Sequence, residues 1–280
     1  MAAAALAMLA TLGGCAGGPQ NPSFPLTTKQ ADADLAEMHE HPVPLARPVV
    51  VLGGYNDPGV AASTIRDVLE RAVGDDKFVL VSFGDAKTFA ECRARVIEAV
   101  EKAYPDGTTL PSGRRETVEV DVVANSLGGL VGRYAAMWPA DAVDPATDAA
   151  DPTANTRLYV RRMFTLLAPH QGAAMADPKS DDELMRDMAI GSAFIAMLDT
   201  NLPSGNYELV SYGRLGDLMV GVEHTAPPGV TPHWVPGHAI EPSHLSAFGD
   251  RRILADIARQ LRGEPPYTID PPSPIPTDGH

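Results

Sequence analysis

The residues with the clearest capacity for chemistry lie between Val122 and Leu130, in the stretch VVANSLGGL. The pattern predicts a buried strand that runs directly into a helix, with Ser126 alone at the junction. Such a turn strains the backbone at the serine and needs small residues two positions to either side, here Ala124 and Gly128. It exposes the hydroxyl at a helix N-terminus, where free N–H groups and the helix dipole favour negative charge. Because an oxyanion forms during acyl transfer, we expect Ser126 to be an acyl-transfer nucleophile.

The alternative for this stretch is an ordinary serine cap at the start of a helix, which is common. Small residues on both sides of the serine, between a strand and a helix, are much rarer, so we favour the nucleophile. The stretch resembles the G-x-S-x-G motif of the α/β-hydrolase superfamily, particularly bacterial lipases and esterases of the triacylglycerol lipase type. Two positions depart from that pattern: Ala124 replaces the first glycine, and Asn125 stands where many lipases have histidine.

A second stretch, PVVVLGGY from Pro48 to Tyr55, is similar to the first core strand of that family. In the family this strand ends in His-Gly, whereas Gly53 replaces the histidine here. The resemblance implies that the backbone N–H groups of Tyr55 and Leu127 form the oxyanion hole. The alternative is a plain glycine turn.

A third stretch, RMFTLLAPHQG from Arg162 to Gly172, looks like the strand T-L-A-T-P-H-x-G of the same lipases. His170 in this stretch could be mistaken for a catalytic base. The resemblance instead implies a structural loop residue close to the site.

A serine nucleophile needs a base, and the base needs a carboxylate to hold its tautomer. The family's chain order is serine, acid, histidine. The stretch RLGDLMV is similar to the family's acid loop and implies Asp217 as the acid, with Glu223 as the second choice. The stretch PSHLS precedes a terminal helical pattern and implies His244 as the base, with His238 as the second choice.

The resemblance implies a serine hydrolase that cleaves carboxylic esters of small molecules or lipids through an acyl-enzyme, without a cofactor. Two alternatives stay open. One is another acyl-transfer enzyme, such as a thioesterase, amidase or acyltransferase, and the other is a non-catalytic envelope lipoprotein. A zinc site would need clustered ligands. His233, His238 and His244 come nearest to that, and we expect no metal.

The N-terminus has features of an export signal. The apolar run from Ala2 to Leu12 is shorter than the roughly 20 residues that span a bilayer, and it has the length of a signal-peptide core. Leu12 to Cys15 resembles a bacterial lipobox, although no Lys or Arg precedes it. We therefore expect a lipid anchor on Cys15 and a place in the bacterial cell envelope. A cleaved secretory signal and an uncleaved tail are the alternatives.

Charge and cysteine content limit the partners that the protein can bind and the disulfides that it can form. The formal net charge is −14, which disfavours nucleic acid and electrostatic docking to anionic lipid. If Cys15 is lipidated, Cys92 is the only thiol left, so no intrachain disulfide can form. We expect Cys92 to be a small buried hydrophobe, and the protein to be a monomer.

Apolar runs alternate with helical patterns between residues 46 and 262, which predicts a doubly wound, mostly parallel α/β sheet of about six strands, the α/β-hydrolase fold. The residues before it divide into a signal peptide with a lipobox (1–15) and a flexible tether (16–45), and a Pro-rich tail predicted to be disordered follows (263–280). Residues 173–206 are a candidate cap insert. Its apolar face either binds an acyl chain or packs on the core. Strands are predicted at 49–52, 78–81, 118–124, 162–168, 208–212 and 233–235, and helices at 61–73, 86–104, 127–137, 182–198 and 245–261.

Overall fold

A computed structural model describes residues 19–138, 153, 155–237 and 242–277. Its centre is a seven-stranded sheet in the order β2-β1-β4-β5-β6-β7, with β3 paired to β4. Every pair along that order is parallel, and only β3 is antiparallel. The predicted fold class, a doubly wound and mostly parallel α/β sheet, is confirmed. The strands are β1 (Val49–Tyr55), β2 (Phe78–Phe83), β3 (Thr108–Thr109), β4 (Arg115–Asn125), β5 (Thr156–Leu166), β6 (Glu208–Arg214) and β7 (His233–Val235).

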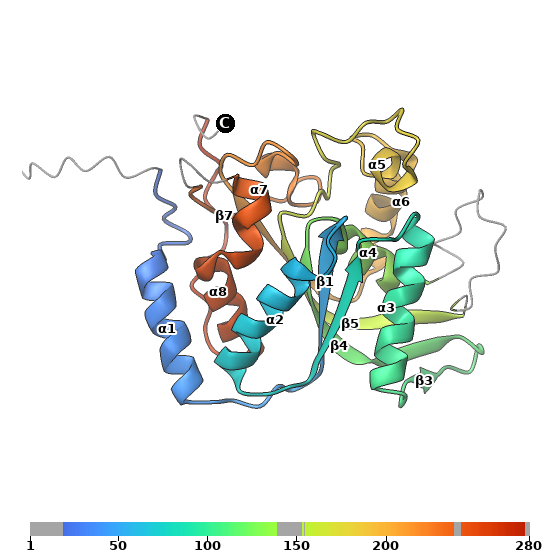
Figure 1. Cartoon of the computed structure of the whole chain (residues 1–280), viewed down its shortest axis with the longest axis horizontal. Helices are drawn as coiled ribbons and strands as arrows, with labels where there is room; N and C mark the ends of the chain where they lie inside the picture. The colour runs from blue at the N-terminus through green and yellow to red at the C-terminus, as the bar shows by residue number, and fades with distance from the viewer. Residues whose placement is uncertain (1–18, 139–152, 154, 238–241, 278–280) are drawn as a thin grey trace, which may run out of the picture.

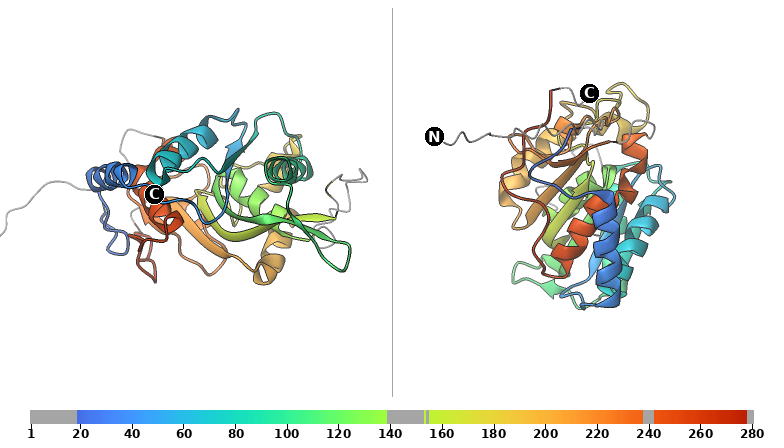
Figure 2. Two further views of the ribbon diagram at one scale, coloured as in Figure 1. Left: turned by 90° about the horizontal axis from the view of Figure 1, so that it is seen from below. Right: turned by 90° about the vertical axis from the view of Figure 1, so that its left-hand side faces the viewer.

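Helices cover both faces of the sheet. On one face α1 (Thr28–Glu40), α2 (Val60–Val73) and α8 (Arg251–Leu261) lie side by side over a buried apolar cluster (Figures 1 and 2). The other face carries α3 (Phe89–Ala103), α4 (Leu127–Ala136), α5 (Glu183–Asp187) and α6 (Ala193–Asn201) over a second cluster. The short helix α7 (Ser243–Ser246) and the 3-10 turns η2 (Leu202–Ser204), η3 (Val222–His224) and η4 (Ala247–Gly249) complete the fold. Continuous apolar strands are buried because helices lie above and below them.

The described part of the predicted tether, residues 19–45, is not a flexible linker. It contains α1, which begins with a capping box between Thr27 and Gln30. Ala31, Leu35 and Met38 follow at helical spacing and are buried against the α2 and α8 side of the core. The prediction was wrong because the Pro, Gly and Asn content of the segment hid this short amphipathic pattern.

The described part of the Pro-rich tail, residues 263–277, is extended but lies against the domain, so the prediction of disorder was wrong there. Asp256, a fully buried residue of α8, accepts hydrogen bonds from the backbone N–H groups of Tyr267 and Thr268. Farther along, the indole of Trp234 donates to the carbonyl of Ser273 at 2.9 Å. Polar contacts of this kind hold the tail against the domain, because the tail has few apolar side chains of its own.

Two predicted helices are each divided by a turn. The predicted helix at 182–198 is two helices, α5 and α6, because Gly191 between them adopts φ +77°. Ser192 then caps α6 by accepting from the N–H of Ile195. The predicted helix at 245–261 is α7, η4 and α8, and Asp250 caps α8. The first of these breaks separates the two helices of the insert, and the second separates His244 from the last helix.

Within the described ranges, no helix is both long enough and apolar enough to cross a bilayer. The predicted signal peptide at 1–15, with Cys15, lies outside the described residues.

The carboxylate of Asp256 gives a test of how the C-terminal tail is held. It accepts five hydrogen bonds, from Tyr212, Gln260, Tyr267 and Thr268, the last through both backbone and side chain. Asp256→Ala should lower the free energy of unfolding by about 2–4 kcal/mol, because donors that are buried or half-buried are left without this acceptor. Urea denaturation of the full chain measures this.

The matched control is Asp32→Ala, which removes a pair with Arg251 on the surface of the α1–α8 contact. A pair this exposed should change stability by at most about 0.5 kcal/mol. Equal stability losses in the two variants would contradict the role given to Asp256.

Candidate active site

Ser126 occupies a sharp turn between β4 and α4. Its backbone has φ 52° and ψ −124°, a region that residues with a side chain rarely adopt. The turn is fixed from both sides, since the N–H of Ser126 donates to the carbonyl of Leu166 at 2.8 Å and its carbonyl accepts from Gly129 at 3.0 Å. The sequence predicted this strained junction, and the structure places the serine at it.

Small residues around the turn let α4 approach the sheet closely. A Cβ on Gly128 would lie 2.5 Å from the carbonyl oxygen of Gly53 and 2.9 Å from the Cβ of Leu52. A Cβ on Gly129 would lie 2.4 Å from the Cβ of Ala168. Since such distances are shorter than any normal contact, α4 can hold this position only with glycine at both places.

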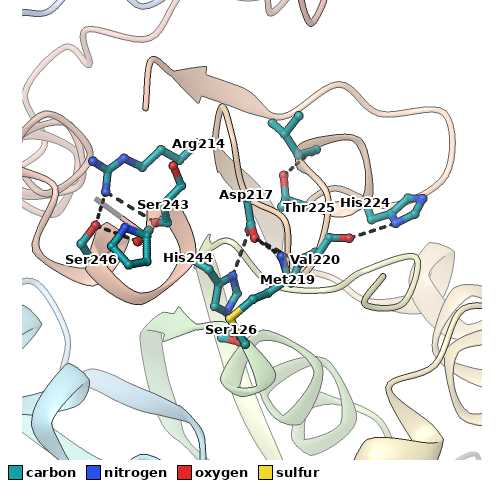
Figure 3. Close-up of polar contacts among 12 residues, drawn as sticks. Ser126, Arg214, Asp217, Met219, Val220, His224, Thr225, Ser243, His244 and Ser246 are labelled. Atoms are coloured by element: carbon teal, nitrogen blue, oxygen red, sulfur yellow. Dashed lines mark hydrogen bonds and ion pairs between the residues drawn. The ribbon is translucent and has the colours of Figure 1, made fainter. Parts of the chain in front are cut away.

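The side chain of His244 reaches Ser126 from α7. Its Nε2 lies 2.9 Å from the Ser126 hydroxyl, and its Nδ1 lies 2.9 Å from Oδ2 of Asp217 (Figure 3). The ionised carboxylate can only accept, so Nδ1 carries the proton and Nε2 is left to accept from the serine. The structure therefore brings together the three residues that the sequence analysis selected as nucleophile, base and acid.

Asp217 is held in a loop that follows β6. Its Oδ1 accepts from the N–H groups of Met219 at 2.9 Å and Val220 at 3.1 Å, while Oδ2 faces His244. The side chain is fully buried, so both oxygens of the carboxylate need these partners. Glu223, the second choice for the acid, is exposed on η3 and is not the carboxylate that contacts His244. His238, the second choice for the base, lies outside the described residues.

Polar contacts hold α7, the helix that carries His244, and the sequence analysis did not predict them. Arg214, at the end of β6, donates to the hydroxyl of Ser246 at 2.6 Å (Figure 3). Ser243 donates to the carbonyl of Leu215 at 2.9 Å. The two serines therefore tie α7 to the end of β6 from both sides of His244. The serines flank the histidine in sequence, but only the fold reveals that an arginine reaches one of them.

His170 is buried in a separate polar chain. Arg133 of α4 donates to its Nδ1 at 3.2 Å, and its Nε2 faces the hydroxyl of Thr165 at 2.9 Å, which in turn donates to Ser211. Burial, and next the charge of Arg133, hold the pKa of His170 well below its ordinary 6.5. A neutral imidazole between these partners has a structural role, as the family resemblance implied.

The end of β1 passes beside Ser126. A Cβ on Gly54 would lie 3.4 Å from the Cβ of Ser126, and Tyr55 follows directly. Leu127 is the first residue of α4, where backbone N–H groups have no partner within the helix. These positions are compatible with an oxyanion hole, and the role of the two N–H groups stays a prediction.

Two further sequence candidates can be placed. Cys92 is buried in the core, and burial raises the pKa of its thiol to about 12, which disfavours the reactive thiolate. His233 lies on β7 and faces Asp270 at 3.5 Å, whereas His244 faces Asp217. Among the described residues, no three His, Cys, Asp or Glu side chains are grouped so that they could hold a metal ion.

The insert packs as part of the domain. Leu184, Ile195 and Leu198 are buried in the same core as α3 and α4, which agrees with the core-packing alternative. Other apolar residues are exposed next to Asp217 and His244 in sequence: Leu218 follows Asp217 and is 74 % exposed, and Leu245 follows His244 and is 61 % exposed. Met175 is exposed as well, and its N–H donates to the carbonyl of Met219.

Comparisons with known proteins find similarity in structure but not in sequence. The sequence matches no protein-family model and no curated protein. Among solved structures, the chain is similar to the mature form of the Bacillus licheniformis lipase BlEst2, with a TM-score of 0.49 and 16% sequence identity. The match covers 82% of this chain and 95% of that one. A likeness this distant assigns no activity, so the function must be argued from the geometry of the site.

The buried imidazole of His170 predicts how stability changes with pH. Because burial lowers its pKa in the folded protein, only the unfolded chain binds this proton just below about pH 6.5. Stability should therefore fall as the pH drops below that value, by up to about 1.4 kcal/mol per pH unit. In His170→Gln this contribution to the slope should disappear. Urea unfolding at several pH values between about 7 and 5 measures the slope.

The control is His39→Gln, which replaces an exposed histidine of α1 and should keep the wild-type slope. A His170→Gln protein whose stability depends on pH as steeply as the wild type would show that other groups cause the dependence.

Proposed function

We propose that this protein is a serine hydrolase that cleaves carboxylic esters with Ser126, His244 and Asp217. The observation that carries the proposal is the continuous hydrogen-bonded path from the serine hydroxyl through the imidazole to the carboxylate, with 2.9 Å at each step. The strained backbone at Ser126 supports it, because strain of this kind persists where it serves a function.

The chemistry follows from the tautomer that Asp217 imposes. His244 Nε2 takes the hydroxyl proton as Ser126 attacks the acyl carbon, and Asp217 stabilises the imidazolium that forms. The imidazolium then gives its proton to the leaving alcohol, and the acyl-enzyme remains. Water, activated in turn by His244, releases the acid and restores the serine.

The negative charge that develops on the carbonyl oxygen must be stabilised by hydrogen-bond donors. The backbone N–H groups of Tyr55 and Leu127 are assigned this role, one from the end of β1 and one from the first turn of α4. Loss of one such donor typically costs a factor of about 10² to 10³ in rate.

The surroundings of the triad favour an apolar acyl group. Leu218 and Leu245 adjoin the acid and the base in sequence, and both side chains are exposed to solvent. Met219, also exposed, adds a flexible side chain that adapts to varied apolar ligands. The net charge of −14 disfavours anionic substrates. An uncharged ester of a small molecule or a lipid fits these features.

The location that we propose is the bacterial cell envelope, with a lipid anchor on Cys15 and the domain acting as a monomer. From Cys15 to residue 19, four residues span at most about 14 Å. An anchor this short would keep the domain close to the membrane surface.

Replacing the nucleophile tests the function. Ser126→Ala should abolish hydrolysis of p-nitrophenyl esters and covalent labelling by a fluorophosphonate probe, because the attacking oxygen is gone. The circular dichroism spectrum should not change. A series of esters of rising acyl length, beside matched thioesters and amides, identifies the acyl group and the bond that is cleaved.

Ser112→Ala, which removes an exposed hydroxyl in the turn before β4, should keep full labelling and turnover. Labelling that persists in Ser126→Ala would end the assignment of the nucleophile. Faster cleavage of thioesters or amides than of esters would replace the proposed substrate class.

The anchor is tested by intact-mass spectrometry of the protein from its native host. We expect a mature N-terminus at Cys15 that carries several acyl chains, because one chain alone anchors only marginally. Cys15→Ser should release the protein from the membrane fraction. An unmodified Cys15 in the wild-type protein would rule out the anchor.

A further inference from the structure

The side chain of Tyr55 joins the end of β1 to the insert. Its hydroxyl donates to Oδ2 of Asp182 at 2.7 Å. Asp182 is the N-cap of α5, and its other oxygen accepts from the N–H of Met185 at 3.3 Å. One carboxylate therefore starts a helix of the insert and, at the same time, holds the residue whose N–H is assigned to the oxyanion.

The main chain at Tyr55 needs such an anchor. The two residues before it, Gly53 and Gly54, have no side chains, and the pairing of β1 with β2 shifts register between Leu52 and Tyr55. The next residue, Asn56, has φ +54°. The strand is therefore irregular where it passes the nucleophile, and the Tyr55 ring is the first side chain beyond the glycines that packs on the core.

The insert that carries Asp182 is itself held firmly. At its start, the N–H groups of Ala174 and Met175 donate to the carbonyls of Val220 and Met219 at 3.2 and 3.0 Å. The N–H groups of Met219 and Val220 in turn donate to the carboxylate of Asp217.

The far end of the insert is fixed to the nucleophile helix. Asp199 of α6 pairs with Arg133 of α4 at 2.9 Å, and the arginine side chain is 1 % exposed. The insert is therefore bonded to the acid loop and to α4, and it can serve as a fixed support for Tyr55.

We propose that Asp182 is a positioning residue, which holds the main chain of Tyr55 where its N–H meets the oxyanion. The inference rests on the proposed function, and it gives the insert a part in that chemistry. Asp182 itself need not touch the substrate. Its effect belongs to the transition state, since an oxyanion donor matters most when the negative charge has formed.

Two single variants break the link in different ways. Tyr55→Phe removes the hydroxyl and keeps the ring and the N–H, while Asp182→Ala removes the acceptor and the helix cap together. Each should lower kcat about tenfold, less than the loss of a whole donor, and leave KM within about twofold. Affinity for a boronic acid that mimics the tetrahedral intermediate should fall by about the same factor as kcat.

Three further variants separate positioning from stability. Asp182→Asn keeps an acceptor for Met185 and a hydrogen-bonding group for the phenol, so it should retain kcat within about threefold. The double variant Tyr55→Phe/Asp182→Ala should lose about tenfold rather than a hundredfold, because both changes remove one interaction. Ser192→Ala removes the cap of α6 in the same insert and should lower the melting temperature without lowering kcat.

Unchanged kcat and boronate affinity in both single variants would overturn the inference. So would an equal loss of kcat in Ser192→Ala, or a hundredfold loss in the double variant. Fluorophosphonate labelling separates the two levels of the argument. A wild-type protein that is not labelled would remove the proposed function and this inference with it, whereas a labelled protein with unchanged variants would remove this inference alone.

Discussion

The site depends on one backbone conformation, the left-handed turn at Ser126. A residue with a side chain pays a conformational cost of order 1–3 kcal/mol to remain there. The surrounding packing offsets that cost, because α4 lies so close to β1 and β5 that only glycine fits at positions 128 and 129. The N–H of Ser126 is bound to the carbonyl of Leu166 in the neighbouring strand, which fixes the turn in the sheet. The parallel sheet is thus the rigid framework that fixes the direction of the Ser126 hydroxyl.

The two residues that complete the hydrogen-bonded path lie outside the sheet, Asp217 in the loop after β6 and His244 on the short helix α7. Each of these segments is held by its own polar contacts. Two backbone N–H groups bind the Asp217 carboxylate, and the serines on either side of His244 tie its helix to Arg214 and to the end of β6. These partners are buried or half-buried, where hydrogen bonds are stronger than in water. The imidazole can therefore sit between serine and carboxylate with little freedom to turn away.

Sequence reasoning predicted most of this fold because its signals are local. Runs such as Val49–Leu52 mark strands covered on both faces, and small residues beside Ser126 mark the turn. It failed where a weak local signal competed with composition. Helix α1 has a capping box and three buried residues, Ala31, Leu35 and Met38. The Pro and Gly content of the same segment nevertheless led to the prediction of a flexible linker. Asp217 and His244 were selected through family resemblance and chain order, since no periodicity encodes the path of a loop. Arg214 and Asp182 were missed because their partners are distant in sequence.

The connections of the insert bear on how a substrate reaches the serine. A lid that swings open as a unit would have to break the backbone bonds to the acid loop, the Tyr55–Asp182 bond and the pair between Asp199 and the buried guanidinium of Arg133. The last step would leave a buried charge without its partner, which is strongly unfavourable. It would also pull on the Asp217 loop and disturb the acid. Opening by a rigid movement of the whole insert therefore conflicts with keeping the triad assembled. Substrate entry is easier to reconcile with local movement of side chains such as Met175, Leu218 and Leu245, which are largely exposed to solvent.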